Sequence, residues 1–319
     1  MKLAFVFPGQ GSQAIGMLTP LSLAYGVVRQ TFAEASTVLG YDLWNLVSQG
    51  PEDQLNATQH TQPAMLTVGV AVWRVWQQQG GPEPLVMAGH SLGEYTALVC
   101  AEAMTFADGV ALVADRGRFM QEAVPAGQGG MAAILGLEDE QVREACRLAA
   151  QGEVLQAVNY NSPGQIVVAG TAAAVARAVA QATHMGAKRA LILPVSVPAH
   201  CALMHPAALR LAERLEKIPV RTPRIRVLHN VHVQAESEPT AIRAALVRQI
   251  EEPVRWVEII QKIAADGIDK LIECGPGKVL AGLNRRIVKT TQTLPVYDPE
   301  NLTQALSHFS AVPASRTGV

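Results

Sequence analysis

The amino-acid sequence predicts an α/β fold with two units, on the basis of three observations. Residues 85–88 form a short apolar run suited to a buried strand, and helical spacing begins at Tyr95 after a sharp, glycine-flanked turn. Residues 131–195 show the element order β-α-β-β-α-β, which is typical of a ferredoxin-like module. The chain has 319 residues, 49% of them hydrophobic, which is enough for one large core or two modest ones.

Composition and charge argue against several classes of function. The formal net charge is -1, so bulk electrostatics indicate neither nucleic acid nor a membrane surface as a partner. The apolar run before Pro8 is too short for the core of a signal peptide. The four cysteines are scattered without a C-x-x-C pair, as is typical of reduced thiols. We therefore expect a cytoplasmic protein.

A glycine-rich loop follows the first predicted strand, residues 2–7. Residues 9–14 match G-x-G-x-x-A, the pattern of a dinucleotide-binding turn. Pro8 removes a backbone donor from that turn, however, and the acidic residue nearest the required distance lies in a helical pattern. The better supported interpretation is a loop whose backbone approaches another ligand and offers the Gln10 N–H as an oxyanion donor.

Helical spacing then recurs over residues 21–39 and from 64 to about 79. Gln62 precedes Pro63 just before the second of these helices. A polar residue there is usually a helix cap or a turn residue, and the alternative is that it faces a ligand. The residues alone leave both interpretations open.

The turn after the strand 85–88 has the pattern G-x-S-x-G, with Ser91 between Gly89 and Gly93. Glycines at these two positions allow strand and helix to cross closely, so the pattern predicts a nucleophile elbow. The Leu92 N–H would then be aimed at an oxyanion formed beside the serine. The alternative is an ordinary connection between a strand and a helix.

A helical pattern over residues 110–123 carries Arg116 and Arg118. Arginines on a helix usually lie on its solvated face, and the pattern alone predicts this for both. The proline- and glycine-rich residues 125–130 then end the helix, and we take them as the entry to the smaller unit. Its predicted strands are 131–135, 155–159, 166–170 and 190–195, and its predicted helices are 138–149 and 172–185.

His200 is the candidate general base for Ser91. It follows a proline-fixed extended segment, where the chain should return from the smaller unit to the larger one, and a cleft is expected at such a junction. His90, within the elbow, and the histidines at 205, 229 and 232 are weaker candidates. No H-E-x-x-H or comparable ligand set is present, so the sequence does not support metal catalysis.

The C-terminal part predicts strands at 226–231 and 269–273 and a helix at 241–249. The glycine-rich turn after the last strand invites comparison with a phosphate-binding loop. It fails the G-x-x-x-x-G-K-[ST] template, because Ile272 and Val279 stand where the template requires Gly and Ser or Thr.

Several short motifs follow one another along the chain: FPGQGSQ from Phe7, TQPA from Thr61, GHSLGEY from Gly89, residues 113–120, NYNSPGQ from Asn159, VPAHC from Val197, Gln249 with PVRW from Pro253, and ECGPG from Glu273. Together these motifs resemble those of one enzyme family, the malonyl-CoA:acyl-carrier-protein transacylases of type II fatty acid synthesis. They occur in the order of the family and span positions 5 to about 280. The resemblance implies a larger α/β-hydrolase-like subdomain, 1–125 and 199–319, interrupted by a ferredoxin-like subdomain, 126–198.

By this resemblance, Ser91 is the nucleophile and His200 its base. The Gln249 backbone carbonyl would orient the imidazole, and the N–H groups of Gln10 and Leu92 would form the oxyanion hole. The implied activity is an S-malonyltransferase that moves a malonyl group from CoA to the phosphopantetheine thiol of acyl carrier protein through a malonyl-serine. The resemblance implies no bound cofactor, because the carrier brings the phosphopantetheine.

Arg116 changes role under this resemblance. It would point into the cleft and bind the malonyl carboxylate with two parallel hydrogen bonds, against the solvated position that the helical pattern predicts. Gln62, Asn159 and Asn161 would be supporting polar groups near the site. Ala199, beside the base, is smaller than the Ser or Phe of many relatives, so we expect a preference for malonyl in a pocket with room for a bulkier α-substituted group.

Three other functions stay open at this point. The same transfer could serve a carrier of a polyketide or malonate decarboxylase system, the elbow and base could belong to a thioesterase or esterase, or the chain could be a carrier-binding scaffold without activity. For the carrier-binding surface, the exposed arginines at 189, 285 and 286 are candidates because they could attract an acidic carrier. A monomer is the default oligomeric state.

Overall fold

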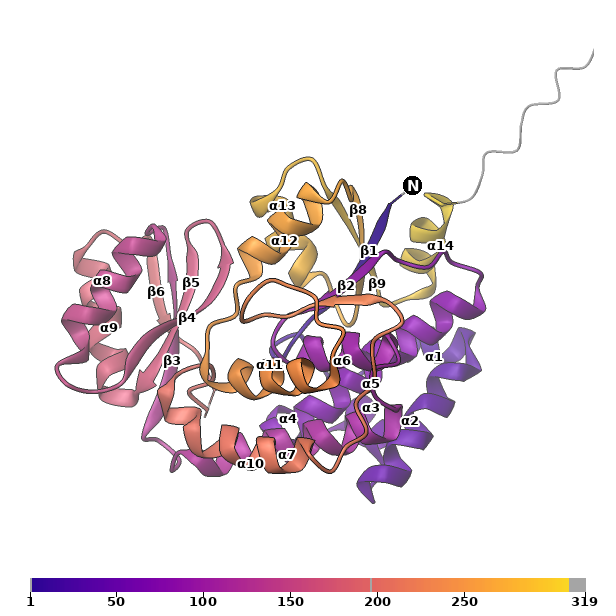
Figure 1. Cartoon of the computed structure of the whole chain (residues 1–319), viewed down its shortest axis with the longest axis horizontal. Helices are drawn as coiled ribbons and strands as arrows, with labels where there is room; N and C mark the ends of the chain where they lie inside the picture. The colour runs from indigo at the N-terminus through magenta and orange to yellow at the C-terminus, as the bar shows by residue number, and fades with distance from the viewer. Residues whose placement is uncertain (1, 196, 310–319) are drawn as a thin grey trace, which may run out of the picture.

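The computed structural model describes residues 2–195 and 197–309, and its larger unit is built on a parallel five-stranded sheet (Figure 1). The strand order is β7-β2-β1-β8-β9, and every neighbouring pair is parallel. The strands are β1 (Leu3–Phe7), β2 (Val86–Gly89), β7 (Arg226–Leu228), β8 (Lys270–Cys274) and β9 (Gln292–Val296).

The central strand β1 is buried on both of its faces, as expected for a parallel sheet covered by helices. Leu3, Phe5 and Phe7 enter one apolar core, whereas Ala4 and Val6 enter the other. Two helices of the larger unit, α12 and α13, cover the second core, and its remaining helices pack around the first core. The helices of this unit are α1 (Thr19–Ala24), α2 (Gly26–Leu39), α3 (Leu43–Gln49), α4 (Glu52–Asn56), α5 (Thr58–Gln78), α6 (Leu92–Cys100), α7 (Phe106–Ala123), α10 (His205–Leu215), α11 (Pro239–Glu251), α12 (Trp256–Ala265), α13 (Val279–Ile287) and α14 (Pro299–Ser307).

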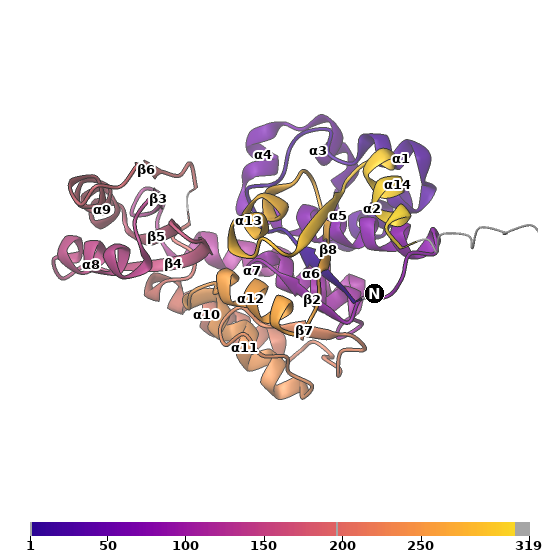
Figure 2. The same ribbon diagram turned by 90° about the horizontal axis from the view of Figure 1, so that it is seen from above.

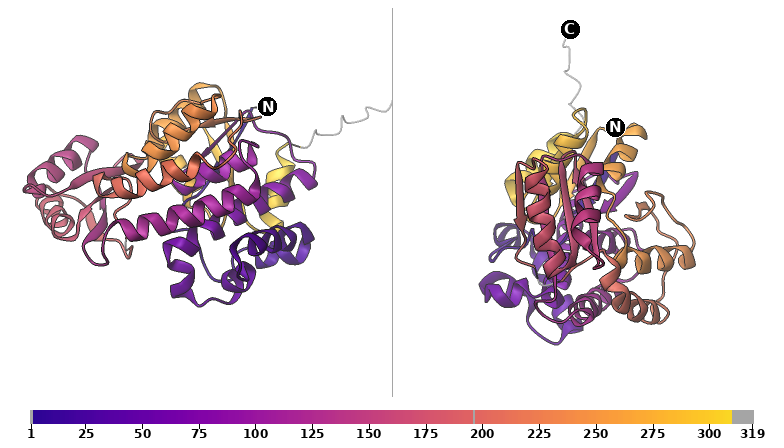
Figure 3. Two further views of the ribbon diagram at one scale, coloured as in Figure 1. Left: turned by 60° about the horizontal axis from the view of Figure 1, so that its bottom comes forward. Right: turned by 90° about the vertical axis from the view of Figure 1, so that its left-hand side faces the viewer.

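The smaller unit has its own antiparallel sheet, with the strand order β4-β5-β3-β6. Its helices α8 and α9 form the outer side of the molecule there and run beside each other (Figures 1 and 3). The predicted ferredoxin-like order of elements is confirmed. The elements are β3 (Gly129–Leu135), α8 (Asp139–Ala150), β4 (Leu155–Ser162), β5 (Gln165–Thr171), α9 (Ala172–His184) and β6 (Arg189–Ile192).

The two units lie side by side (Figure 2) and are joined by backbone hydrogen bonds. Tyr160 N donates to Val254 O at 3.0 Å, and Val254 N donates to Val158 O at 2.8 Å, so β4 is tied to the segment before α12. The chain also enters and leaves the smaller sheet at one place, since a Cβ on Gly129 would lie 2.5 Å from Pro198 Cγ.

The predicted start of the helix containing residues 64–79 was wrong. Helix α5 begins at Thr58, so Gln62 and Pro63 lie inside it rather than before it. The first turn is held by close packing on α7, where a Cβ on Gly117 would come within 2.7 Å of Gln59 Cα. This packing overrides the tendency of a proline to end a helix before it.

Other boundaries also differ from the sequence prediction. The predicted helix 21–39 is two helices, because the backbone is extended at Tyr25 between α1 and α2. Strand β7 ends at Leu228 and β6 at Ile192, each three residues before its predicted end. Residues 310–319 of the predicted larger subdomain lie outside the described residues. Within the described ranges, no helix is long and apolar enough to cross a membrane.

Candidate active site

Ser91 lies on a tight turn between β2 and α6, in a backbone conformation that L-residues rarely adopt, with φ 51° and ψ −108°. Its flanking glycines permit this turn. A Cβ on Gly89 would lie 1.8 Å from Gly93 C, and a Cβ on Gly93 would lie 2.0 Å from Phe7 O. The strained serine and these close approaches are the geometry of a nucleophile elbow.

His200 is within hydrogen-bond distance of Ser91, although the two residues are 109 positions apart. Its Nε2 lies 2.7 Å from Ser91 Oγ, and its Nδ1 lies 2.6 Å from the backbone oxygen of Gln249. A carbonyl oxygen can only accept, so Nδ1 carries the proton and Nε2 accepts from the serine hydroxyl. The peptide carbonyl therefore fixes the tautomer that a general base requires, as a carboxylate does in serine hydrolases.

The His200 imidazole is neutral at physiological pH. Burial, and after it the positive charge of Arg116, lower the pKa of His200 from 6.5 to about 3. The ring is 2% exposed. A neutral ring with a free Nε2 lone pair is the form that takes a proton from a hydroxyl.

A His200→Gln variant is expected to lose less stability in mild acid than the wild type does. Because the folded-state pKa of His200 is about 3 and the ordinary value is 6.5, the unfolded chain binds a proton between these values that the folded chain does not. The contribution of His200 to the free energy of unfolding of the wild type therefore falls as the pH drops below 6.5, by about 2 kcal/mol between pH 7.5 and 5.0. Urea unfolding of both proteins at the two pH values measures this, and equal losses would contradict it.

Arg116 lies in the interior, 1% exposed, instead of on the solvated face that the helical pattern alone predicts. Its Nη1 donates to Gln62 Oε1 at 2.8 Å, and its Nη2 donates to Gln249 Oε1 at 3.0 Å and to Ser91 Oγ at 3.3 Å. The guanidinium also lies over the Tyr95 ring, 5.0 Å from its centroid. Among the described residues, no carboxylate lies within 4.0 Å of the guanidinium, and the buried Nε has no hydrogen-bond partner.

These side chains line a cavity of about 130 Å³ between the two units. Gln10 and Leu92 are both on its wall, and Leu92 is the first residue of α6, so its N–H has no acceptor within the helix. The full lining consists of Gln10, Thr58, Gln62, His90, Ser91, Leu92, Arg116, Met120, Met131, Asn159, Leu193, Val195, Val197, Ala199 and His200.

The supporting polar residues are placed in different ways. Gln62 contacts Arg116, and Asn159 lines the cavity with a buried Oδ1 that has no hydrogen-bond partner among the residues that the structure describes. Asn161 is not part of the lining but accepts a hydrogen bond from His90 Nε2 at 2.7 Å. His90 lines the cavity beside Ser91, a position that the sequence interpretation did not predict.

A buried polar network beneath the turn was missed from the sequence. Glu94 accepts from His229 Nδ1 at 2.7 Å, from Asn230 N at 2.8 Å and from Gln249 Nε2 at 3.0 Å. Asn230 in turn accepts from Ser91 N at 2.8 Å and donates to the Gly89 carbonyl at 2.7 Å. The only available signal was Glu94 itself, a charged residue within an otherwise apolar helix.

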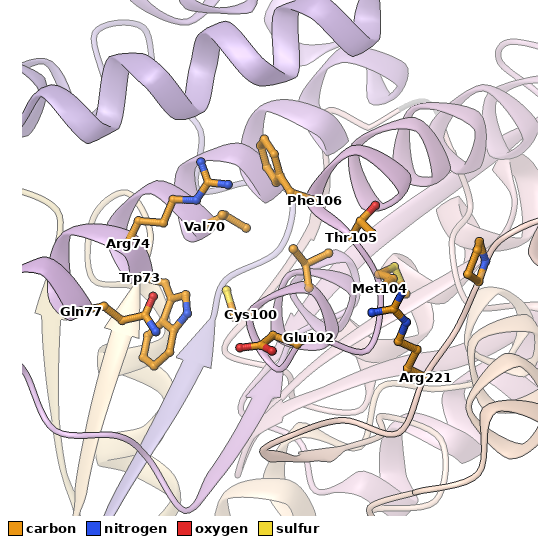
Figure 4. Close-up of a pocket in the computed structure, with 12 residues that line it drawn as sticks. Val70, Trp73, Arg74, Gln77, Cys100, Glu102, Met104, Thr105, Phe106 and Arg221 are labelled. Carbon is orange, nitrogen blue, oxygen red and sulfur yellow. The ribbon is translucent and has the colours of Figure 1, made fainter.

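A second hollow, of about 380 Å³, lies beside α5, α6 and α7, away from these groups (Figure 4). Two of its ionisable groups have other roles or are unreactive. Arg74 pairs with Glu34 at 2.9 Å, and burial raises the pKa of the Cys100 thiol well above its ordinary value, so the sulfur is not a nucleophile. The smaller of these two cavities is the one lined by Ser91, Arg116 and His200.

Comparisons with known proteins agree with this geometry. A family model described as the acyl transferase domain matches residues 4–307. The malonyl CoA-acyl carrier protein transacylase of Salmonella typhimurium is 57% identical over 306 residues, covering 96% of this chain and 99% of that protein. The crystal structure of an acyl carrier protein S-malonyltransferase from Vibrio cholerae superimposes with a TM-score of 0.93 at 57% identity, covering 95% of this chain and 99% of that one.

A further similar structure contains a carrier. It is described as a type II PKS acyl-carrier protein in complex with its malonyl-transacylase, and it has a TM-score of 0.96 at 55% identity, covering 97% of this chain and all of the matched one. The fold and the serine turn are thus those of the acyl transferase class. At these identities and coverages, the chain belongs to the malonyl CoA-acyl carrier protein transacylase family.

Proposed function

We propose that the chain moves a malonyl group from CoA to the phosphopantetheine thiol of an acyl carrier protein in fatty acid biosynthesis, through a malonyl ester of Ser91. The observation that carries this proposal is Arg116, a buried guanidinium 3.3 Å from the Ser91 hydroxyl with no carboxylate partner among the described residues. A buried charge needs a counter-charge, and an acyl group that ends in a carboxylate supplies one at the correct place.

In the first half of the reaction, Ser91 Oγ attacks the thioester carbon of malonyl-CoA while His200 Nε2 takes the hydroxyl proton. The backbone N–H groups of Gln10 and Leu92 hold the oxyanion of the tetrahedral intermediate. When the carbon–sulfur bond breaks, His200 returns the proton to the sulfur and CoA leaves as the thiol. The malonyl group remains as an ester on the serine.

The second half repeats these steps in reverse. The carrier's thiol gives its proton to His200 and attacks the ester carbonyl, the same two N–H groups hold the oxyanion, and Ser91 leaves with the proton restored. Arg116 binds the distal carboxylate throughout with its two Nη groups, while Gln62 and the Gln249 side chain orient it. Asn159 and Asn161 support the cavity wall on the side of the smaller unit.

The reacting groups belong to the larger unit, whereas Asn159 and Asn161 belong to strand β4 of the smaller unit. We propose that 1–125 with 199–319 form one subdomain and 126–198 the other, because β3 to β6 close a sheet with its own apolar core. We also propose that the enzyme works in the cytoplasm and needs no resident cofactor. Among the described residues, no group of three or more His, Cys, Asp or Glu side chains could hold a metal ion.

Intact-protein mass spectrometry tests the proposed intermediate. Incubation with malonyl-CoA is expected to give one malonyl adduct, absent in Ser91→Ala, that holo carrier removes much faster than water does. Slow hydrolysis is expected because apolar side chains such as Met120, Met131 and Val197 line the cavity. Release by water as fast as by the carrier would instead identify a thioesterase.

A carrier from a polyketide pathway is the second candidate acceptor. The observation that favours it is the structure at 55% identity whose partner is a type II PKS acyl-carrier protein. Rates of transfer from malonyl-Ser91 to purified holo carriers of both kinds distinguish the two. We expect the fatty acid carrier to be the faster acceptor.

A further inference from the structure

Glu94 is a buried carboxylate that the reaction steps do not use. It is 0% exposed in the first turn of α6, three residues after the nucleophile. Among the described residues, no arginine or lysine nitrogen lies within 4.0 Å of it, and the basic side chain within that distance is that of His229. Because a buried charge is costly unless it is hydrogen-bonded, its three donors hold it firmly in place.

One of these donors connects Glu94 to the acyl-binding arginine. The Gln249 side-chain amide lies between the two, with Nε2 3.0 Å from Glu94 Oε2 and Oε1 3.0 Å from Arg116 Nη2. A carboxylate can only accept and a guanidinium can only donate, so a single orientation of the amide satisfies both. The same Nε2 also donates to the Ser91 backbone oxygen, at 2.9 Å. Glu94 and this carbonyl together therefore determine that an oxygen, and not an NH₂ group, faces Arg116.

The other arm of the guanidinium has a weaker anchor. Gln62 Oε1 accepts from Arg116 Nη1 at 2.8 Å, but within the described part of the chain the Gln62 amide nitrogen reaches only Met120 Sδ, at 3.6 Å. Sulfur is a poor acceptor, so this amide is held loosely. The hydrogen bonds made by the Gln249 amide are thus the ones that fix the guanidinium relative to Ser91.

We propose that Glu94 is a positioning residue for acyl-group selectivity: through the Gln249 amide, it holds the Arg116 guanidinium in the orientation that receives the carboxylate of the acyl group. Without Glu94, the NH₂ group of the amide keeps one acceptor, the Ser91 carbonyl, instead of two, so the amide and the guanidinium that it contacts are held less firmly. Loading of an acyl group with a distal carboxylate then suffers more than loading of one without. This inference rests on the proposed function, since it assumes that Arg116 binds the acyl carboxylate.

The test compares single-turnover acylation of Ser91 by malonyl-CoA and by acetyl-CoA. For Glu94→Ala, we expect the ratio of malonyl to acetyl loading to fall about five- to tenfold, with the KM for malonyl-CoA rising more than kcat falls. Glu273→Ala is the matched control, because Glu273 is also 0% exposed but accepts from Leu280 N and Ala281 N, away from the cavity. Its ratio should stay at the wild-type value.

Glu94→Gln separates hydrogen bonding from charge. Its carbonyl can accept from Gln249 and Asn230, and its NH₂ group can face His229 in the other tautomer, so most of the selectivity should be restored. An unchanged ratio in Glu94→Ala, equal losses for both substrates, or a Glu94→Gln variant as poor as Glu94→Ala would overturn the proposal.

Two further variants keep the result interpretable. If circular dichroism shows that Glu94→Ala does not fold, Gln249→Leu removes the hydrogen bonds of the amide while keeping the backbone carbonyl that His200 uses. The ratio should fall there too, and an unchanged ratio would overturn the proposal. An unchanged ratio of malonyl to acetyl loading in Arg116→Ala would overturn the proposed function itself. A ratio that changes in Arg116→Ala but not in Glu94→Ala would overturn only this inference.

Discussion

A His200→Ala variant is expected to load malonyl groups onto Ser91 roughly 10⁴ to 10⁶ times more slowly than the wild type. Without the imidazole, the serine hydroxyl keeps its proton, because Arg116, the other group recorded at hydrogen-bond distance from Oγ, can only donate. Rapid-quench measurement of the acyl-enzyme under single-turnover conditions gives the rate directly.

His205→Ala is the matched control for this measurement. His205 follows five residues later, is largely exposed and pairs with Glu251 at 2.9 Å, so its loss should leave acylation at the wild-type rate. A His200→Ala variant that is less than about tenfold slower would contradict the assignment of the base. In that event, the His90 ring in the same cavity would be the next candidate.

An Arg116→Ala variant is expected to lose malonyl loading by roughly 10- to 150-fold while acetyl loading is kept or increases. The loss corresponds to about 1.5 to 3 kcal/mol for a carboxylate deprived of its charged hydrogen bonds. An acetyl group has no distal carboxylate, so it loses no charged hydrogen bond when the guanidinium is removed, and it gains space in the cavity. Competition between the two thioesters, followed by intact-protein mass spectrometry, measures the preference.

Two arginine variants serve as controls for that result. Arg116→Lys keeps the positive charge but loses the planar pair of donors, so its preference should lie between those of the wild type and Arg116→Ala. Arg118 is on the same helix with 46% of its side chain exposed and pairs with Asp115 at 2.7 Å. Arg118→Ala should behave as the wild type, and a shift there as large as in Arg116→Ala would show that helix α7, rather than the guanidinium, sets the preference.

Local patterns in the sequence were sufficient for the parts of the fold that depend on neighbouring residues. The elbow could be predicted because the two glycines around Ser91 meet a steric requirement of the turn itself. The order of elements in the smaller unit could be predicted because each strand and helix there has a clear period and a polar or glycine-containing boundary.

Features that depend on distant residues could not be predicted in the same way. A helical pattern cannot tell that Arg116 is buried, since the surfaces that cover it come from α5, α6 and α11. Only the resemblance to a family indicated that position. The early start of α5 needs the close approach at Gly117, and the Glu94 network joins residues more than 130 positions apart. Short helices such as α3 and α4 have too few turns for a period to show.

Because Gly129 and Pro198 lie next to each other, we expect that the smaller sheet can be exchanged as one continuous segment between these two points. Recombination at these two neighbouring points would replace Met131 and Asn159 in the cavity wall, while Ser91 and the other reactive groups stay with the host. The connections in the host would keep their present lengths, because both crossover points lie at one spot. Chimeras of this kind offer a route to new acyl preferences that leaves the chemical machinery untouched.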